Sequence, residues 1–184
     1  MFTLMRRMAI RLRDTYLVQI KWRRYAIGKN FHAGRNVVIW AKKSVTIGDY
    51  CYIGRNSQIE CNIKIGKYVL IANNVAFVGR YDHNYQQIGT PVRFVSQIRD
   101  INYAWKEVDV VTEVQDDVWI GYGSIILSGV TIAKGCIIGA GSVVVKDTEE
   151  YAIYAGSPAK KIANRFKSQE DTDNHKELLK TYAV

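Results

Sequence analysis

The sequence predicts an all-β chain, wound as a coil of short parallel strands with a triangular cross-section. The first observation is an aliphatic residue at every sixth position of 117–147, namely Ile120, Ile126, Ile132, Ile138 and Val144. The second is that Gly or Ala directly follows three of them, and that small residues recur at the same spacing, as Ser124, Val130, Cys136 and Ser142. A helix repeats at about 3.6 residues and an ordinary strand at two. A period of six instead indicates short strands joined by tight turns, three to a coil.

The first 26 residues are expected to form a basic amphipathic helix. Its apolar positions keep helical spacing, at Met5, Met8, Ala9, Leu12, Tyr16 and Ile20. The net charge of +9 is concentrated in residues 1–35, where nine Lys and Arg residues face one acid, Asp14, for +8. Such a helix can make peripheral contact with an anionic membrane surface. It can equally pack against the coil or a neighbouring subunit while its charges stay solvated, and both interpretations remain open.

The coiled domain is expected over 27–150, with about five coils in two blocks. The first block, 27–79, holds about three coils and the second, 114–149, about two more. Within the first block the six-residue frame slips by two positions after Val45, which a bulge or a larger corner would explain. The final segment, 151–184, is expected to be a helical extension, with a helix starting near Ala159, a mobile polar stretch over 168–175 and a short C-terminal helix after it.

An excursion loop over 80–113 interrupts the repeat between the two blocks. Loops this long inside a compact domain are usually functional or disordered. This one is rich in aromatic residues, which favours order on contact with something; they are Tyr81, Tyr85, Phe94, Tyr103 and Trp105. Since loops on a rigid scaffold often carry chemistry, the candidate active site is expected here.

Composition excludes several other classes of function. The longest apolar run falls short of the roughly 18–20 residues that span a bilayer, and the start of the chain does not resemble a signal peptide. The three cysteines form neither a CxxC pair nor a Cys/His cluster, so no metal is expected and the thiols are expected to be reduced, in a cytoplasmic protein or one at the inner face of the membrane. The basic segment lacks a recognisable nucleic-acid module, so no nucleic-acid partner is expected.

The hexapeptide pattern resembles the left-handed parallel β-helix acyltransferases, which include galactoside, maltose, xenobiotic and polysaccharide-biosynthesis O-acetyltransferases. The left-handed winding follows from this resemblance alone. In these enzymes an "LIA-x-N-V" coil precedes a loop with the catalytic histidine, and here residues 70–75 read LIANNV with His83 close behind. His83 is therefore the predicted general base. His32 is expected to be a surface corner residue, and His175 a solvated residue of the tail.

The same resemblance implies acetyl-CoA as co-substrate and a homotrimer whose sites lie between subunits. Small corner residues let the pantetheine arm approach the coil, which selects Gly121, Gly123, Gly139 and Ala140. Trp119 matches an aromatic that lines the site. Lys160 matches a residue that meets the CoA phosphates, and Lys161 lies beside it.

The acceptor is predicted to be a sugar hydroxyl, free or lipid-linked, in cell-surface polysaccharide or lipopolysaccharide biosynthesis. Polar residues near His83 are the expected sugar ligands: Arg80, Asp82, Asn84 and Tyr85. The same machinery could acetylate the nitrogen of an amino sugar, an antibiotic or another amine. A β-helix that serves only as a non-enzymatic scaffold is the remaining alternative, and it would not bind CoA.

Overall fold

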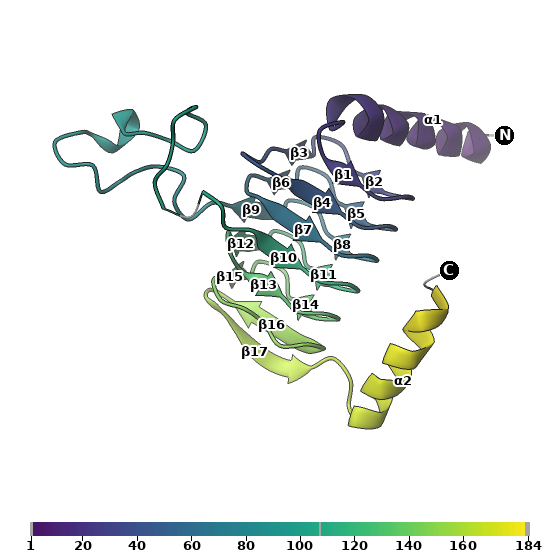
Figure 1. Cartoon of the computed structure of the whole chain (residues 1–184). Helices are drawn as coiled ribbons and strands as arrows, with labels where there is room; N and C mark the ends of the chain where they lie inside the picture. Colours follow the sequence, from purple (N-terminus) through teal and green to yellow (C-terminus); the bar gives the residue numbers. More distant parts are fainter. Residues whose placement is uncertain (1, 107, 183–184) are drawn as a thin grey trace.

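Three sheets, parallel except for one antiparallel pair of strands at the C-terminal end of the coil, form the sides of a triangular coil in the computed structural model, which describes residues 2–106 and 108–182 (Figure 1). Sheet A holds β1 (Ala26–Ile27), β4 (Val45–Ile47), β7 (Ile63–Ile65), β10 (Thr112–Val114) and β13 (Thr131–Ile132). Sheet B holds β2 (His32–Ala33), β5 (Tyr52–Ile53), β8 (Leu70–Ile71), β11 (Trp119–Ile120), β14 (Ile137–Ile138), β16 (Ala152–Gly156) and β17 (Ala159–Asn164). Sheet C holds β3 (Val38–Ile39), β6 (Gln58–Ile59), β9 (Ala76–Val78), β12 (Ile125–Leu127) and β15 (Val143–Val144).

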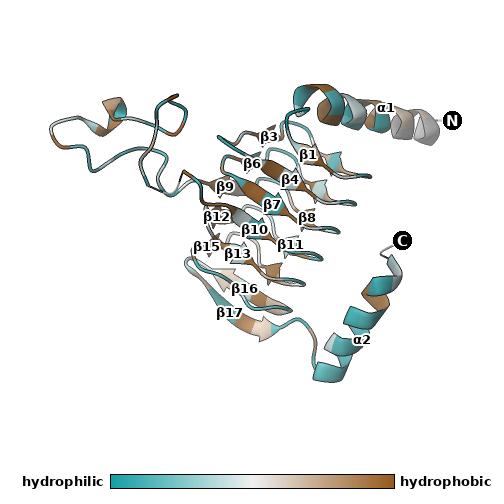
Figure 2. Cartoon of the chain, in the orientation of Figure 1, coloured by the Kyte–Doolittle hydropathy of each residue, from teal (hydrophilic) through white to brown (hydrophobic). Residues whose placement is uncertain are grey.

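The core is a ladder of inward aliphatic side chains. In sheet B, Ile53, Ile71, Ile120 and Ile138 are in register on successive coils, and each is fully buried. Burying an aliphatic side chain stabilises a fold by about 1.5–3 kcal/mol, so every coil supplies its own share of the core. Figure 2 shows the resulting hydrophobic colouring concentrated on the strands, while α2 (Gln169–Leu179) is mostly hydrophilic.

The predicted break in the frame after Val45 is explained by a strand of three residues. In β4, Val45 and Ile47 both point into the core, with Thr46 exposed between them. Val45 ends one six-residue frame and Ile47 begins the next, so a two-residue step keeps both side chains on the inner face. Strand β7 repeats this arrangement with Ile63 and Ile65.

The excursion loop does not interrupt the strand pairing of the coil. Strand β10 pairs with β7 and β12 with β9, although residues 79–111 lie between β9 and β10. The loop leaves the body of the coil and contains a 3₁₀ turn, Val92–Phe94 (Figure 1). Its boundaries agree with the predicted 80–113 except that β10 already begins at Thr112.

The C-terminal extension corrects the sequence prediction. The helix expected from Ala159 is strand β17, which forms an antiparallel hairpin with β16. Strand β16 pairs with β14 and would otherwise leave an open edge at the end of sheet B, so β17 satisfies its backbone groups. Sheet B therefore has seven strands, and the solenoid is longer than the five coils predicted. The predicted short C-terminal helix is present as α2, but it begins earlier than expected, within the stretch predicted to be mobile, with Ser168 as its N-cap.

The N-terminal segment is helical as predicted but ends early, with α1 over Phe2–Tyr16 and a π-helical turn over Leu17–Lys21. Leu17 and Val18 pack against the core, and the neighbouring Trp22 is buried against Phe31. The predicted apolar face is more than half exposed at Met5, Met8, Leu12, Tyr16 and Ile20. Within the described residues, neither helix is long and apolar enough to cross a membrane.

Candidate active site

The corner where sheet B turns into sheet C is a column of small residues, here called the glycine edge. It contains Gly34, Gly54, Ala72, Gly121, Gly139 and Ala155 on successive coils. A Cβ on Gly121 would lie 2.6 Å from the backbone nitrogen of Ala140 in the next coil, so glycine is required by the close approach of the two coils. The buried Ser124 hydroxyl donates to the carbonyls of Gly121 and Gly139, at 2.9 and 3.1 Å, and ties these two coils together.

Most of the predicted cofactor residues lie at the glycine edge. Gly121, Gly123, Gly139 and Ala140 follow β11 and β14 directly. Trp119, in β11, leads into the same corner and is half exposed on the outer face of sheet B. Tyr122 is also half exposed, and its hydroxyl accepts a hydrogen bond from the Asn74 side chain of the preceding coil. The edge therefore offers a small-residue surface flanked by two aromatic rings.

The two predicted phosphate-binding lysines have different surroundings. Lys160 is opposite Ala155 in the β16–β17 hairpin, and Ala155 in turn stacks under Gly139. It therefore lies at the end of the glycine edge, and within 2–106 and 108–182 it forms no ion pair. Lys161 donates to Glu149 at 2.7 Å, and this hydrogen bond raises the pKa of the lysine. The structure thus leaves Lys160 better placed than Lys161 to meet an anion.

His83 lies at the base of the excursion loop with its side chain exposed. Its backbone forms an antiparallel bridge with Gln97, and its carbonyl accepts from the Tyr85 N–H at 2.9 Å. In the described part of the chain, the imidazole has no hydrogen-bond partner. Its neighbour Asp82 is half-buried against Gly79, and burial is the main reason that the pKa of its carboxyl is raised. The imidazole is therefore accessible to a substrate, as a general base must be.

The predicted acceptor ligands are only partly gathered around His83. Arg80 extends along the coil toward its C-terminal end and donates to the Val145 carbonyl at 2.5 Å, which occupies part of its guanidinium. Tyr85 packs edge-on against Trp105, with ring centroids 4.8 Å apart. The side-chain oxygen of Asn84 is buried and has no hydrogen-bond partner within the described residues. Of these residues, Asn84 has an unmet hydrogen bond, and Tyr85 contributes an aromatic surface.

His83 and the glycine edge belong to different corners of the triangle. The loop with His83 follows β9 in sheet C and leads into sheet A, whereas the glycine edge joins sheet B to sheet C. The full width of sheet C separates the two corners. One chain therefore does not bring the predicted base and the predicted cofactor residues together.

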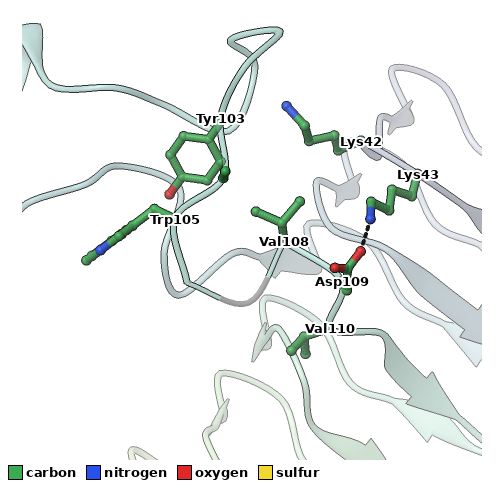
Figure 3. Close-up of a pocket in the computed structure, with 8 residues that line it drawn as sticks. Lys42, Lys43, Tyr103, Trp105, Val108, Asp109 and Val110 are labelled. Atoms are coloured by element: carbon green, nitrogen blue, oxygen red, sulfur yellow. Dashed lines mark ion pairs between the residues drawn. The ribbon is translucent and has the colours of Figure 1, made fainter.

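A pocket of about 630 Å³ lies between the loop and the first coil, and sequence reasoning missed it (Figure 3). It is lined by Lys42, Lys43, Tyr103, Ala104, Trp105, Val108, Asp109 and Val110. Lys42 donates to the carbonyls of Ile98 and Asp100, at 3.0 and 2.6 Å, and Lys43 forms an ion pair with Asp109. Tyr103 is buried, and its hydroxyl donates to the Tyr81 carbonyl near His83. The aromatic content of the loop was its only signal in the sequence, because the lysines come from a distant coil.

Two histidines outside the loop have structural contacts. His175 was expected to be solvated, but its Nε2 lies 2.8 Å from Asp117, which also pairs with Arg165 at 2.7 Å. His32 contacts Asp14 of α1 through Nδ1 at 2.6 Å and stacks on Tyr52. Within 2–106 and 108–182, His, Cys, Asp and Glu side chains form no group of three that could hold a metal ion.

Comparison with known proteins places the repeat in a family. The model of the bacterial transferase hexapeptide (six repeats) matches residues 44–78 and 112–146. A chloramphenicol acetyltransferase from Agrobacterium fabrum is 36% identical over 107 residues, which cover 55% of this chain and 51% of that protein. A probable acetyltransferase from Mycobacterium tuberculosis is 31% identical over 147 residues, covering 78% of this chain and 45% of the relative. The chain thus spans about half the length of these curated relatives.

A solved structure supports the same architecture. AntD, an N-acyltransferase from Bacillus cereus, was solved with dTDP-4-amino-4,6-dideoxyglucose and coenzyme A. It superposes with a TM-score of 0.57 over 89% of this chain and 95% of its own. The identity is 19%, so this likeness shows the fold alone.

Proposed function

We propose that this chain, whose repeat matches the bacterial transferase hexapeptide model, transfers an acetyl group from acetyl-CoA to a sugar hydroxyl. The glycine edge carries this proposal, because it presents a column of small residues along successive coils and ends beside Lys160. A slender chain such as pantetheine can lie against backbone only where side chains are small. A lysine at the end of the column suits the phosphates of CoA.

In the proposed reaction His83 is the general base. Its exposed imidazole takes the proton from the acceptor hydroxyl as the oxygen attacks the thioester carbonyl. A C–O bond forms, the C–S bond breaks, and the proton taken up by His83 can pass to the departing sulfur. The products are an acetyl ester and CoA, with the imidazole neutral again. Since a thioester already has a good leaving group, no covalent intermediate with the protein is required.

The distance between the two corners supports a site shared by two copies of the chain, and we propose a homotrimer with three such sites. The loop that carries His83 projects from the coil and exposes Ile88 and Ile101 almost fully. Large exposed apolar side chains on a projecting loop suit contact with another protein surface. A loop that reaches a neighbouring glycine edge would unite His83 with the cofactor residues.

The pocket at the base of the loop is the proposed site for the sugar ring of the acceptor. Trp105, which is partly exposed, offers an aromatic surface of the kind on which sugar rings pack, and Lys43 with Asp109 provides polar groups in the same pocket (Figure 3). Carbohydrate binding in cell-surface polysaccharide or lipopolysaccharide assembly is the function that this combination suits best. Acetylation of an antibiotic is the second candidate, because one similar protein is named for chloramphenicol.

An acetyl-CoA consumption assay tests the proposal. The purified chain is offered sugars, nucleotide-linked sugars, amino sugars and chloramphenicol, and mass spectrometry with mild alkaline hydrolysis identifies the product. We expect an alkali-labile O-acetyl sugar. An alkali-stable amide formed only with amines would replace O-acetylation by N-acetylation. Failure to bind acetyl-CoA at all would favour the scaffold alternative.

A further inference from the structure

A second pocket, of about 580 Å³, lies between α1 and the first two coils, at the N-terminal end of the glycine edge. Its lining is Ala9, Ile10, Arg13, His32, Gly34, Arg35, Tyr52 and Arg55. Three arginines thus come together from separate parts of the chain, one from α1 and one from each of two corners. Neither the proposed base nor the predicted cofactor residues belong to this pocket.

The coil holds two of the arginines one above the other. Residues 34–36 and 54–56 both read Gly-Arg-Asn and form the same corner on consecutive coils. The Asn56 N–H donates to the Arg35 carbonyl at 2.9 Å, and the Asn36 side chain donates to that of Asn56 at 3.1 Å. Adjacent strands lie about 4.8 Å apart, so Arg35 and Arg55 are neighbours of like charge, an arrangement that costs stability. In the described residues, neither guanidinium contacts a carboxylate.

The helix supplies the third arginine and closes the pocket. Arg13 donates to the Ala33 carbonyl and to Asp14 at 3.1 Å, while its Nε is buried without a partner in the described structure. Asp14 does not line the pocket, but it contacts two residues that do, since it also lies 2.6 Å from His32 Nδ1. Three arginines against Asp14 leave an excess of two positive charges around the cavity. Such an excess, held by rigid corners, is complementary to a dianion.

We propose that this pocket binds the phosphate or diphosphate group of the acceptor. Guanidinium groups bind phosphate oxygens bidentately, and two stacked arginines match two adjacent phosphates. The assignment to the acceptor rests on the proposed function. If Lys160 meets the phosphates of CoA at one end of the glycine edge, the thioester points toward the other end, where Arg35 and Arg55 lie. The acceptor would then be a sugar activated as a phosphate or diphosphate ester.

The test is binding of soluble and lipid phosphate to the full chain. Inorganic pyrophosphate and UDP are titrated by calorimetry without acetyl-CoA, against wild type, Arg35→Gln, Arg55→Gln and the double variant. Arg23→Gln is the matched control, since Arg23 is exposed and lies outside the pocket. We expect each pocket variant to weaken pyrophosphate binding by about 10-fold or more, as for a lost hydrogen bond to a charged group. Arg23→Gln should stay within about twofold, as surface substitutions usually do.

Vesicles distinguish the source of the phosphate. If the natural group is carried by a membrane lipid, vesicles of phosphatidylglycerol should bind and the double variant should lose them, while phosphatidylcholine vesicles stay unbound. If the source is soluble, the double variant should lose affinity for pyrophosphate and UDP, while its binding to vesicles should equal that of the wild type. Equal losses in Arg23→Gln and the pocket variants, or no response of any probe to Arg35 and Arg55, would overturn the site. Intact pyrophosphate binding in a chain that does not bind acetyl-CoA would overturn only the acceptor role, and would count against the proposed function separately.

Discussion

The coil and the excursion loop differ in how they are held. In the coil, each inward residue contacts its counterpart on the next coil, and the corner hydroxyls of Ser124 and Ser142 are hydrogen-bonded. The loop over 79–111 is fixed near its base by backbone contacts such as Ile98 N–H to the Asp82 carbonyl at 2.8 Å, and it leaves Ile88 and Ile101 exposed. If the loop carries the proposed chemistry, stability and activity depend on different parts of this chain, and substitutions should change one without the other.

The largest expected effect is the loss of activity when the proposed general base, His83, is removed from the loop. His83→Ala should lower kcat by roughly 10²–10⁴, the range for general-base assistance, while folding and acetyl-CoA binding stay unchanged because His83 is exposed. His83→Asn should be equally slow, because an amide cannot take the proton. Steady-state kinetics with the identified acceptor measure the effect. A His83→Ala protein that keeps more than about a third of the rate would exclude His83 as the base.

For the coil, the opposite result is expected: a substitution in its core should lower stability, whereas one in the loop should not. Ile71→Ala should lower the free energy of unfolding by about 2–5 kcal/mol, because it leaves a cavity in a fully buried ladder. Ile88→Ser, at an almost fully exposed loop position, should change it by less than about 0.5 kcal/mol. Urea denaturation of the two variants gives both numbers. Equal destabilisation would mean that the loop is as integral to the fold as the coil.

A smaller effect, on the affinity for CoA, should distinguish the two lysines at the end of the glycine edge. Lys160→Ala should weaken CoA binding by about 1–3 kcal/mol if it meets a phosphate. Lys161→Ala should have less effect, because this ammonium already pairs with Glu149. Calorimetry with CoA and dephospho-CoA resolves which phosphate is involved. An affinity unchanged in Lys160→Ala contradicts the proposed contact.

The smallest effect is expected inside the coil, at its cysteines. Burial raises the pKa of Cys51 and of Cys61 to about 11, so at pH 8 only about one Cys51 in a thousand is a thiolate. Native protein should therefore resist iodoacetamide, whereas an Ile88→Cys variant should react at its exposed loop position. Mass spectrometry counts the labels. Rapid labelling of Cys51 in the folded wild type would show that the coil opens locally.

The same two thiols predict how stability depends on alkaline pH. The unfolded chain releases these protons near pH 9, whereas the folded chain holds them until about pH 11. The free energy of unfolding should therefore fall as the pH rises through this window, because the unfolded state gains more by ionising. Denaturation at pH 8 and pH 10.5 checks the direction. Cys51→Ala should reduce the slope if the thiol itself is responsible.

The coil, and the position of His83 next to it, could be predicted from the sequence alone. The hexapeptide period is a local property, since each inward residue is chosen by its own strand, and the period survives an insertion of more than thirty residues. The LIANNV stretch before His83 and the corner glycines are likewise readable, because close backbone approach admits no larger residue at Gly121. The expected reduced, buried state of Cys51 and Cys136 follows from the same small inward positions, and both are buried free thiols.

Contacts between distant segments could not be predicted from the sequence and are seen in the three-dimensional structure. Strand β17 forms because the edge of β16 needs a partner, a demand that residues 159–164 do not reveal by themselves. The helix α1 turns Arg13 toward Arg35 and Arg55 and leaves its predicted apolar face exposed, because its docking is set by Leu17, Val18 and Trp22. The separation of His83 from the glycine edge depends on which corner of the triangle follows each strand. These are long-range consequences of stacking whole coils, and no local pattern of six residues contains them.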